Sequence, residues 1–228
     1  MRLPFSKNVN GFLCFAFLTA CTAHNEIVVP SGLEALAPMR LDPPVMQNGQ
    51  YPEDFLLLSG EDIDSQGEVY GWAQGRGYLY ATPEKVWQSI RVPDVYINHG
   101  EVTSYEVEEM SSVDYDYLYI VWNYVENIMT IEFENEWRHG LILGDKDKPE
   151  HIAIRWEKVS GTDFILSLNG SIQIYDRGFL DDGTPVCEIQ VIEHLQSTLD
   201  PEENALNYID RLWPRWKAAV HDEEIPHQ

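Results

Sequence analysis

Two polar residues stand where the strand patterns of this sequence are otherwise apolar, and they are the first candidates for chemistry. Asn135 interrupts the apolar face of residues 128–137, and Glu193 interrupts that of residues 186–196. A buried carboxyl group without a partner is costly, so it shifts its pKa or meets a ligand. We therefore predict that Glu193 is a polar group in a cavity and a candidate general acid or base. The alternatives are a strand irregularity that turns it outward, or a Tyr or Arg that satisfies it.

No other sequence pattern indicates an active site. The seven histidines form no His-x-x-x-His pair, so we predict no metal site and no cofactor. The sequence contains neither a Gly-x-Ser-x-Gly elbow nor a phosphate-binding glycine loop, and Cys187 has no basic neighbour along the chain. These absences favour a binding protein over an enzyme.

The N-terminus carries a targeting signal. Arg2 and Lys7 precede the short apolar run of residues 12–18, which is too short to span a membrane and is typical of a secretory signal peptide. Residues 18–21 read Leu-Thr-Ala-Cys and resemble the lipobox of bacterial lipoproteins. The resemblance implies that residues 1–20 are removed and that Cys21 receives the lipid. The alternative is an ordinary signal peptide that happens to carry a cysteine.

The same resemblance implies a location in the cell. Several acyl chains on Cys21 would hold the protein on a membrane, and Thr22, in place of the aspartate typical of inner-membrane retention, favours the outer membrane, facing the periplasm. Cys14 leaves with the signal, so an exported domain would keep Cys187 alone and have no internal disulfide.

Composition limits the partners. The chain has 228 residues, which suit one main domain, and a formal net charge of -23. Such a charge repels phosphate backbones and anionic lipid headgroups, so nucleic acid is excluded as a partner and the lipid alone would hold the protein to the membrane. We expect a monomer.

Residues 21–66 look like a lipidated N-terminus and tether. Five prolines interrupt this stretch and no helical or strand period persists in it. The apolar run of residues 55–58 is the exception, and we expect it to dock on the folded domain or to form a short helix. The folded domain is predicted over residues 67–223, with a tail at residues 224–228.

The folded part begins with a strand and two short helices. Residues 68–80 alternate bulky and small side chains, which indicates a strand. Thr82 suits a helix N-cap and Pro83 the first helical position. Val86, Trp87 and Ile90 then form an apolar stripe, and a second short helix is predicted near residues 94–98.

Six strands and a long helix follow. The strands are predicted at residues 101–110, 115–126, 128–137, 151–158, 163–175 and 186–196, joined mostly by short polar links. The helix begins after Asp200, and Pro214 should kink it.

This order of elements is similar to that of the START-like superfamily, also called SRPBCC, which includes polyketide cyclase-like, coenzyme Q-binding and plant-allergen-like proteins. Residues 81–87, Ala-Thr-Pro-Glu-Lys-Val-Trp, resemble the opening of the family's first helix. The resemblance implies an α+β helix-grip fold: a curved antiparallel sheet of about seven strands around a long C-terminal helix, with two short helices after the first strand.

In that fold a cavity lies between the sheet and the C-terminal helix. The acids Glu132, Glu134 and Glu136 share one strand face, so the alternate residues should face inward. The same alternation and the helical stripe predict these cavity residues: Ile131, Phe133, Asn135, Trp137, Ile154, Trp156, Leu166, Leu168, Glu193, Ile209 and Trp213. Most of them could equally be plain core.

Three functions remain open from the sequence. The first is a membrane-anchored envelope lipoprotein that binds or carries an apolar ligand such as a lipid, a quinone or a polyketide-like molecule. The second is a cyclase- or aromatase-like enzyme that uses Glu193 or a cavity tyrosine as general acid or base. The third is a ligand-free envelope interaction module.

Overall fold

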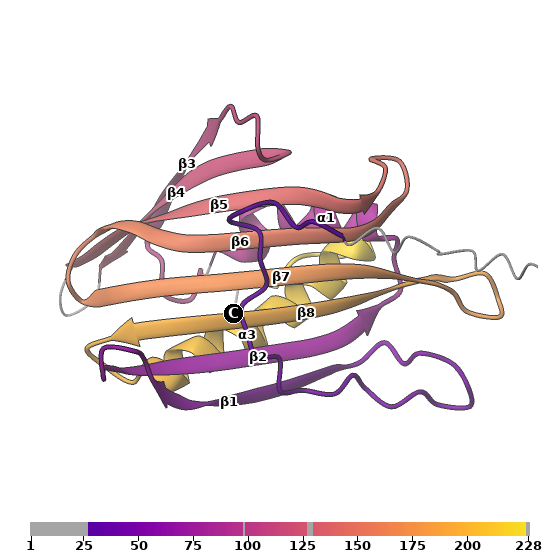
Figure 1. Cartoon of the computed structure of the whole chain (residues 1–228), viewed down its shortest axis with the longest axis horizontal. Coiled ribbons are helices and arrows are strands. Elements are labelled where there is room, and N and C mark those ends of the chain that lie inside the picture. The colour runs from indigo at the N-terminus through magenta and orange to yellow at the C-terminus, as the bar shows by residue number, and fades with distance from the viewer. Residues whose placement is uncertain (1–26, 98, 127–129, 227–228) are drawn as a thin grey trace, which may run out of the picture.

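The computed structural model describes residues 27–97, 99–126 and 130–226. It is an α+β fold in which one curved antiparallel sheet of eight strands packs against three helices, an arrangement compatible with a helix grip (Figure 1). The strands are β1 Phe55–Ile63, β2 Val69–Leu79, β3 Ser104–Met110, β4 Tyr117–Glu126, β5 Thr130–Gly144, β6 Pro149–Gly161, β7 Ile165–Phe179 and β8 Pro185–Ser197. The helices are α1 Pro83–Ile90, α2 Pro93–Tyr96 and α3 Pro201–Val220.

The strand order in the sheet is β1-β2-β8-β7-β6-β5-β4-β3. The prediction of about seven strands was wrong by one, because β1 lies in the stretch that the sequence assigned to a tether. It pairs with β2 over its whole length, from Phe55 opposite Gly77 to Ile63 opposite Val69. Small residues on β2 make room for it: a Cβ at Gly75 would meet the Phe55 ring at 2.1 Å.

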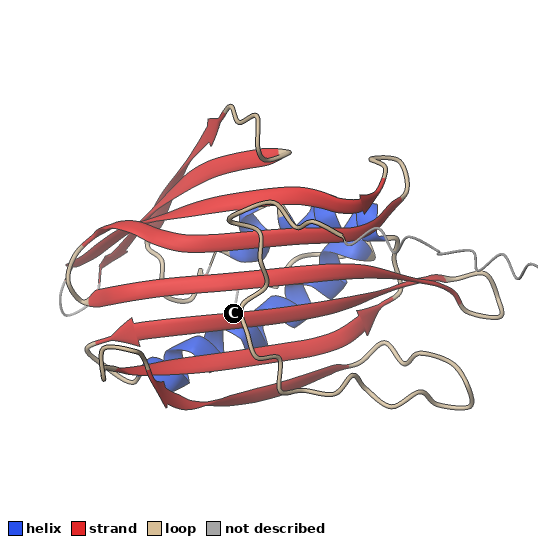
Figure 2. Cartoon of the chain, viewed as in Figure 1, coloured by secondary structure: helices blue, strands red, loops and turns tan. Residues whose placement is uncertain are grey.

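All three helices lie on one face of the sheet, which we call the inner face (Figure 2). Helix α1 begins as predicted, since the Thr82 side chain accepts a hydrogen bond from the Lys85 N–H at 3.3 Å and Pro83 is the first helical residue. Helix α3 packs over β1, β2 and β8, whereas α1 packs over β6 and β7. Pro214 lies inside α3, which continues to Val220.

The opposite, outer face of the sheet is crossed by the N-terminal segment, residues 27–50 (Figure 1). Backbone groups of this segment bond to side chains of the sheet: Leu36 N–H donates to Ser171 Oγ at 2.9 Å, and Gln74 Nε2 donates to the Pro38 carbonyl at 2.6 Å. Leu33 is fully buried above Gly140, where a Cβ would approach its Cδ1 to 2.3 Å. The part of the predicted tether that the structure describes is therefore a strap on the domain.

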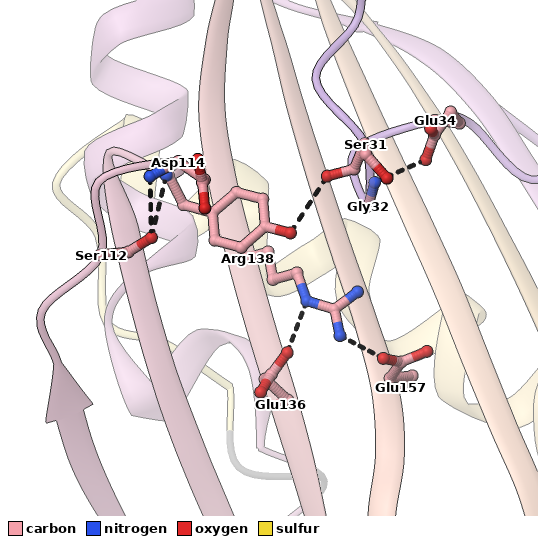
Figure 3. Close-up of polar contacts among 9 residues, drawn as sticks. Ser31, Gly32, Glu34, Ser112, Asp114, Glu136, Arg138 and Glu157 are labelled. Carbon is pink, nitrogen blue, oxygen red and sulfur yellow. Dashed lines mark hydrogen bonds and ion pairs between the residues drawn. The ribbon is translucent and has the colours of Figure 1, made fainter.

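Figure 3 shows where this strap begins to pack on the sheet. The hydroxyl of Tyr115 donates to the Ser31 carbonyl at 3.0 Å. Beside it, the Arg138 guanidinium of β5 is held between the carboxylates of Glu136 and Glu157. These pairs are partly exposed, so their main effect is to fix the position of Arg138 under the strap.

Residues 1–26, which include the predicted signal peptide and Cys21, lie outside the described residues. Among the helices that the structure describes, none has the length and apolar character needed to cross a membrane. At the other end, the predicted tail contacts the domain, because Arg215 Nε donates to the Pro226 carbonyl at 3.2 Å.

Candidate functional site

A cavity of about 160 Å³ lies on the inner face, between strands β4 to β8, helix α2 and the first half of α3. Its lining is mostly apolar and aromatic. The residues that line it are Tyr96, Ile97, Glu101, Val102, Val121, Asn123, Val125, Ile131, Phe133, Asn135, Trp137, Trp156, Phe164, Ile165, Leu168, Glu193, Leu195, Ser197, Asn204 and Tyr208.

The floor of the cavity is one row of residues that runs across neighbouring strands. Glu193 on β8 pairs with Gly170 on β7, Gly170 with Trp156 on β6, and Trp156 with Trp137 on β5. Residues paired in this way have side chains on the same face of a sheet. A Cβ at Gly170 would lie 1.8 Å from Cζ2 of Trp156. The Trp156 indole therefore crosses β7 over this glycine and reaches toward Glu193.

Aromatic rings form one wall of the cavity. Trp137 and Trp156 are stacked, with ring centroids 4.7 Å apart and planes 14° apart. Tyr96 of α2 packs on Trp137 at 5.0 Å, and Tyr208 of α3 meets Trp156 edge-on at 6.2 Å. The Tyr208 hydroxyl donates to the Tyr96 carbonyl at 3.1 Å and so ties α3 to α2. These rings are thus held in mutual contact by the packing of two helices on the sheet.

Glu193 is 3% exposed, and its ionisation is strongly affected by its surroundings in the cavity. Burial raises its pKa well above the usual range, a nearby Trp156 N–H lowers it, and the Glu101 carboxylate raises it again. Burial dominates, so the environment of Glu193 favours its protonated, neutral form. No hydrogen bond joins it to a Tyr or His among the residues that the structure describes.

Three more polar atoms of the lining are buried without a partner in the described chain. They are Tyr96 Oη, Asn135 Oδ1 and Trp156 Nε1, from residues that are 3%, 7% and 1% exposed. The Trp156 N–H is near Glu193 without making a hydrogen bond of ordinary geometry. Buried polar atoms normally have partners, so a cluster of such atoms around one cavity indicates a place where a ligand supplies them.

A second buried polar group lies next to the cavity but does not line it. Trp87 Nε1–H donates to His139 Nδ1 at 3.1 Å, so the neutral imidazole carries its proton on Nε2 and donates it to the Tyr119 hydroxyl at 2.9 Å. Burial, with a smaller effect of Arg91, lowers the pKa of His139 to about 3. His139 has its partners within the core, so this group stabilises the fold.

The structure places the predicted cavity residues in two groups. Those at the cavity are Ile131, Phe133, Asn135, Trp137, Trp156, Leu168 and Glu193. Ile154 and Ile209 are fully buried in the core away from it, and Trp213 stacks on Phe55 with ring centroids 4.8 Å apart. For Trp213 the physical reason is the unexpected strand β1, because Phe55 of that strand packs on the Trp213 ring.

The structure contradicts the prediction that Leu166 faces the cavity. The alternation of residues 164, 166 and 168 predicted that it faces inward, but it is 54% exposed. The pairing of β7 with β8 shifts between Ile165 and Ser167, so the alternation is interrupted there. Phe164 and Ile165 both line the cavity as a result, and Leu168 resumes the inward face.

Several lining residues were missed by sequence reasoning. The sequence could have indicated that Tyr208 faces inward, because it lies three residues after Ala205 and four before Leu212 on the same helical face. No sequence pattern indicates that Tyr96 faces inward, since α2 is only four residues long. On β4 both faces carry bulky apolar side chains, so alternation alone could not show that Val121 and Asn123 face inward.

Other reactive groups do not gather near the cavity. Among the described residues, no three His, Cys, Asp or Glu side chains lie close enough to hold a metal ion. Burial raises the pKa of the Cys187 thiol, which is unexposed, so the thiol stays protonated. The chemistry available in the cavity is therefore hydrogen bonding and proton exchange by Glu193.

Comparisons with known proteins give only distant structural likenesses. No family model and no curated protein matches the chain. Solved structures that resemble it include Ara h 8.0201 (11% identical, covering 73% of this chain and 97% of that chain, TM-score 0.37). XoxI from Bacillus cereus is 10% identical, covers 66% of this chain and 93% of its own, and has a TM-score of 0.37. An uncharacterized protein from Rhizobium leguminosarum is 12% identical, covers 73% of this chain and 99% of its own, and has a TM-score of 0.44. Likeness at this level carries no argument about function.

Proposed function

We propose that the protein is a bacterial envelope lipoprotein whose START-like domain binds a small apolar ligand in the cavity between the sheet and α3. The observation that carries this proposal is the cavity itself, with its aromatic wall and its cluster of unpartnered polar atoms. A pocket of this kind, mostly apolar with a few convergent polar groups, is the usual form of a small-molecule site.

The volume limits the ligand. Drug-sized ligands occupy pockets of about 300–1,000 Å³, whereas an apolar cavity of ~150 Å³ accepts benzene. The cavity of about 160 Å³ therefore suits one ring-sized group. A quinone-like ring fits this limit better than a whole lipid or a polyketide, unless the rest of such a molecule extends out past the rim, where Glu101 lies half-exposed.

The enzyme alternative has less support. A carboxyl group within hydrogen-bond reach of a Tyr or His in the cavity would support a cyclase-like mechanism. Glu193 makes no hydrogen bond to a Tyr or His in the described chain, and the Tyr208 hydroxyl donates to the Tyr96 carbonyl. Binding without chemistry is the simpler account of this cavity.

Anchoring is the second part of the proposal and is supported by the Leu-Thr-Ala-Cys motif alone. We propose that Cys21 carries the lipid and that the domain faces the periplasm from the outer membrane. Because the strap packs on the sheet from Ser31 onward, only about ten residues would separate the lipid from the folded domain.

Native mass spectrometry of the full-length protein, with organic extraction of the same sample, tests the binding proposal. We expect an added mass of a few hundred daltons at most, released on extraction as a ring-containing apolar molecule. If nothing co-purifies and no small aromatic compound binds to the emptied protein, the proposal is wrong.

A further inference from the structure

The polar groups of the cavity have a charge preference that the proposed function leaves open. The lining includes two carboxyl groups, Glu101 and Glu193, and no Lys, Arg or His among the described residues. An anionic ligand would meet two acids and no positive partner, which makes its desolvation unfavourable. The lining therefore disfavours fatty carboxylates and phosphate esters as ligands buried in the cavity.

The unpartnered atoms distinguish between the remaining neutral and cationic ligands. Asn135 Oδ1 can only accept hydrogen bonds, and Tyr96 Oη can accept one. If Glu193 ionises, its carboxylate accepts from the neighbouring Trp156 N–H and still has lone pairs facing the cavity. A ligand with several N–H donors and one positive charge would satisfy all four groups together.

The walls also suit a cation. Trp137, Trp156 and Tyr96 line the space and pack on one another, with ring centroids 4.7 Å and 5.0 Å apart. Ammonium groups bind to aromatic faces, most strongly to Trp, so a ring face that borders the cavity can hold one. The formal charge of -23 on the chain raises the local concentration of cations around it.

The cationic side chains nearby are already engaged. Arg211 pairs with Glu101 at 3.4 Å, and Arg215 donates to the carbonyls of Ile97 and Pro226. Neither lines the cavity. An ionised Glu193 would therefore have no counter-ion among the described residues, and a cationic ligand would supply one.

We propose that the cavity binds a primary amine carried on a ring-sized apolar body, with its ammonium group held by Glu193, Asn135 and Tyr96 and its ring packed on Trp137 and Trp156. On binding, Glu193 releases its proton to solvent and the amine stays protonated, so the pair gains no net charge. This inference rests on the proposed function, because it assumes that the cavity is open to small ligands.

Three probes of nearly equal size test the inference by isothermal titration of the full-length protein: benzylamine, benzyl alcohol and benzoate. We expect benzylamine to bind at least ten times more tightly than benzyl alcohol and benzoate not to bind. In Glu193→Gln the preference for the amine should fall below threefold. Glu203→Gln, which removes the same charge from an exposed position at the start of α3, should keep the preference.

Each result is decisive. If benzyl alcohol binds as tightly as benzylamine, or if Glu193→Gln keeps a tenfold preference, the amine proposal is wrong while the cavity remains a ligand site. If benzoate binds best, the charge argument is wrong. If no probe binds at millimolar concentration, the proposed function fails and the amine proposal fails with it.

Discussion

The Trp156 indole lies directly over Gly170, so close that a single added Cβ would come within 1.8 Å of its Cζ2 atom. This contact lets a side chain from β6 cross β7 and reach the carboxyl group of Glu193 on β8. A glycine in the middle of a strand usually weakens it. Here the glycine creates the space in which the floor of the cavity forms.

We therefore expect Gly170→Ala to displace the Trp156 ring. Overpacking of this kind costs about 1–3 kcal/mol of unfolding free energy, which urea unfolding would measure. The same substitution in a Trp156→Phe background should cost less, because the smaller ring leaves room for the methyl group. Equal costs in both backgrounds would show that the contact does not limit packing.

The ionisation of Glu193 should make the protein less stable as the pH rises. Its folded pKa is raised above the ordinary value of 4.5, and the titratable groups that face it are Glu101 and Tyr208. Above pH 4.5 the folded state binds more protons than the unfolded state, so stability falls by up to about 1.4 kcal/mol per pH unit until the folded pKa is reached. Glu193→Gln removes this loss. Urea unfolding should show that the stability of the variant relative to the wild type increases between pH 5 and pH 8. If the difference in unfolding free energy is the same at both pH values, the assignment is wrong.

His139 should make the protein less stable as the pH falls, opposite to the effect of Glu193. Its folded pKa is lowered to about 3 from 6.5, so the unfolded state binds more protons below pH 6.5 and stability falls as the pH falls. His151 and His194 have lowered pKa values too, so the wild type loses stability from several groups. In His139→Gln, stability should depend less steeply on pH between 6.5 and 4, because unfolding then takes up about one proton fewer. An unchanged slope would mean that His139 is charged in the folded state.

Lipidation depends on one thiol. Cys21→Ser should abolish metabolic labelling by an alkyne fatty acid and release the protein from the membrane fraction. Cys187→Ser is the control, because that thiol is fully buried in the core and should not affect labelling. Labelling that persists in the Cys21 variant would exclude the lipobox interpretation.

Much of the architecture could be predicted from local sequence patterns. Thr82 and Pro83 mark the start of α1, and the alternation along β5 places Phe133, Asn135 and Trp137 at the cavity. Both depend on interactions within a few residues along the chain, which sequence periodicity reports directly.

The failures involve long-range packing. The strand β1 follows a proline-rich stretch, and nothing local shows that it pairs with the glycine-rich β2. The outward turn of Leu166 comes from a register shift against β8, which no pattern within β7 reveals. Glu193 was singled out because it is polar on an apolar face. That Trp156 is its neighbour could be found only from the strand pairing across Gly170.

The central claim is that a ligand occupies the cavity, and filling the cavity tests it most directly. Leu168→Trp adds an indole to a residue that lines it, while Leu166→Trp places the same side chain two residues away on the exposed face. Isothermal titration with benzyl alcohol should show affinity at least tenfold lower for Leu168→Trp and unchanged for Leu166→Trp, with both variants folded by thermal unfolding. If a folded Leu168→Trp protein binds as tightly as the wild type, the ligand lies elsewhere and the account is wrong.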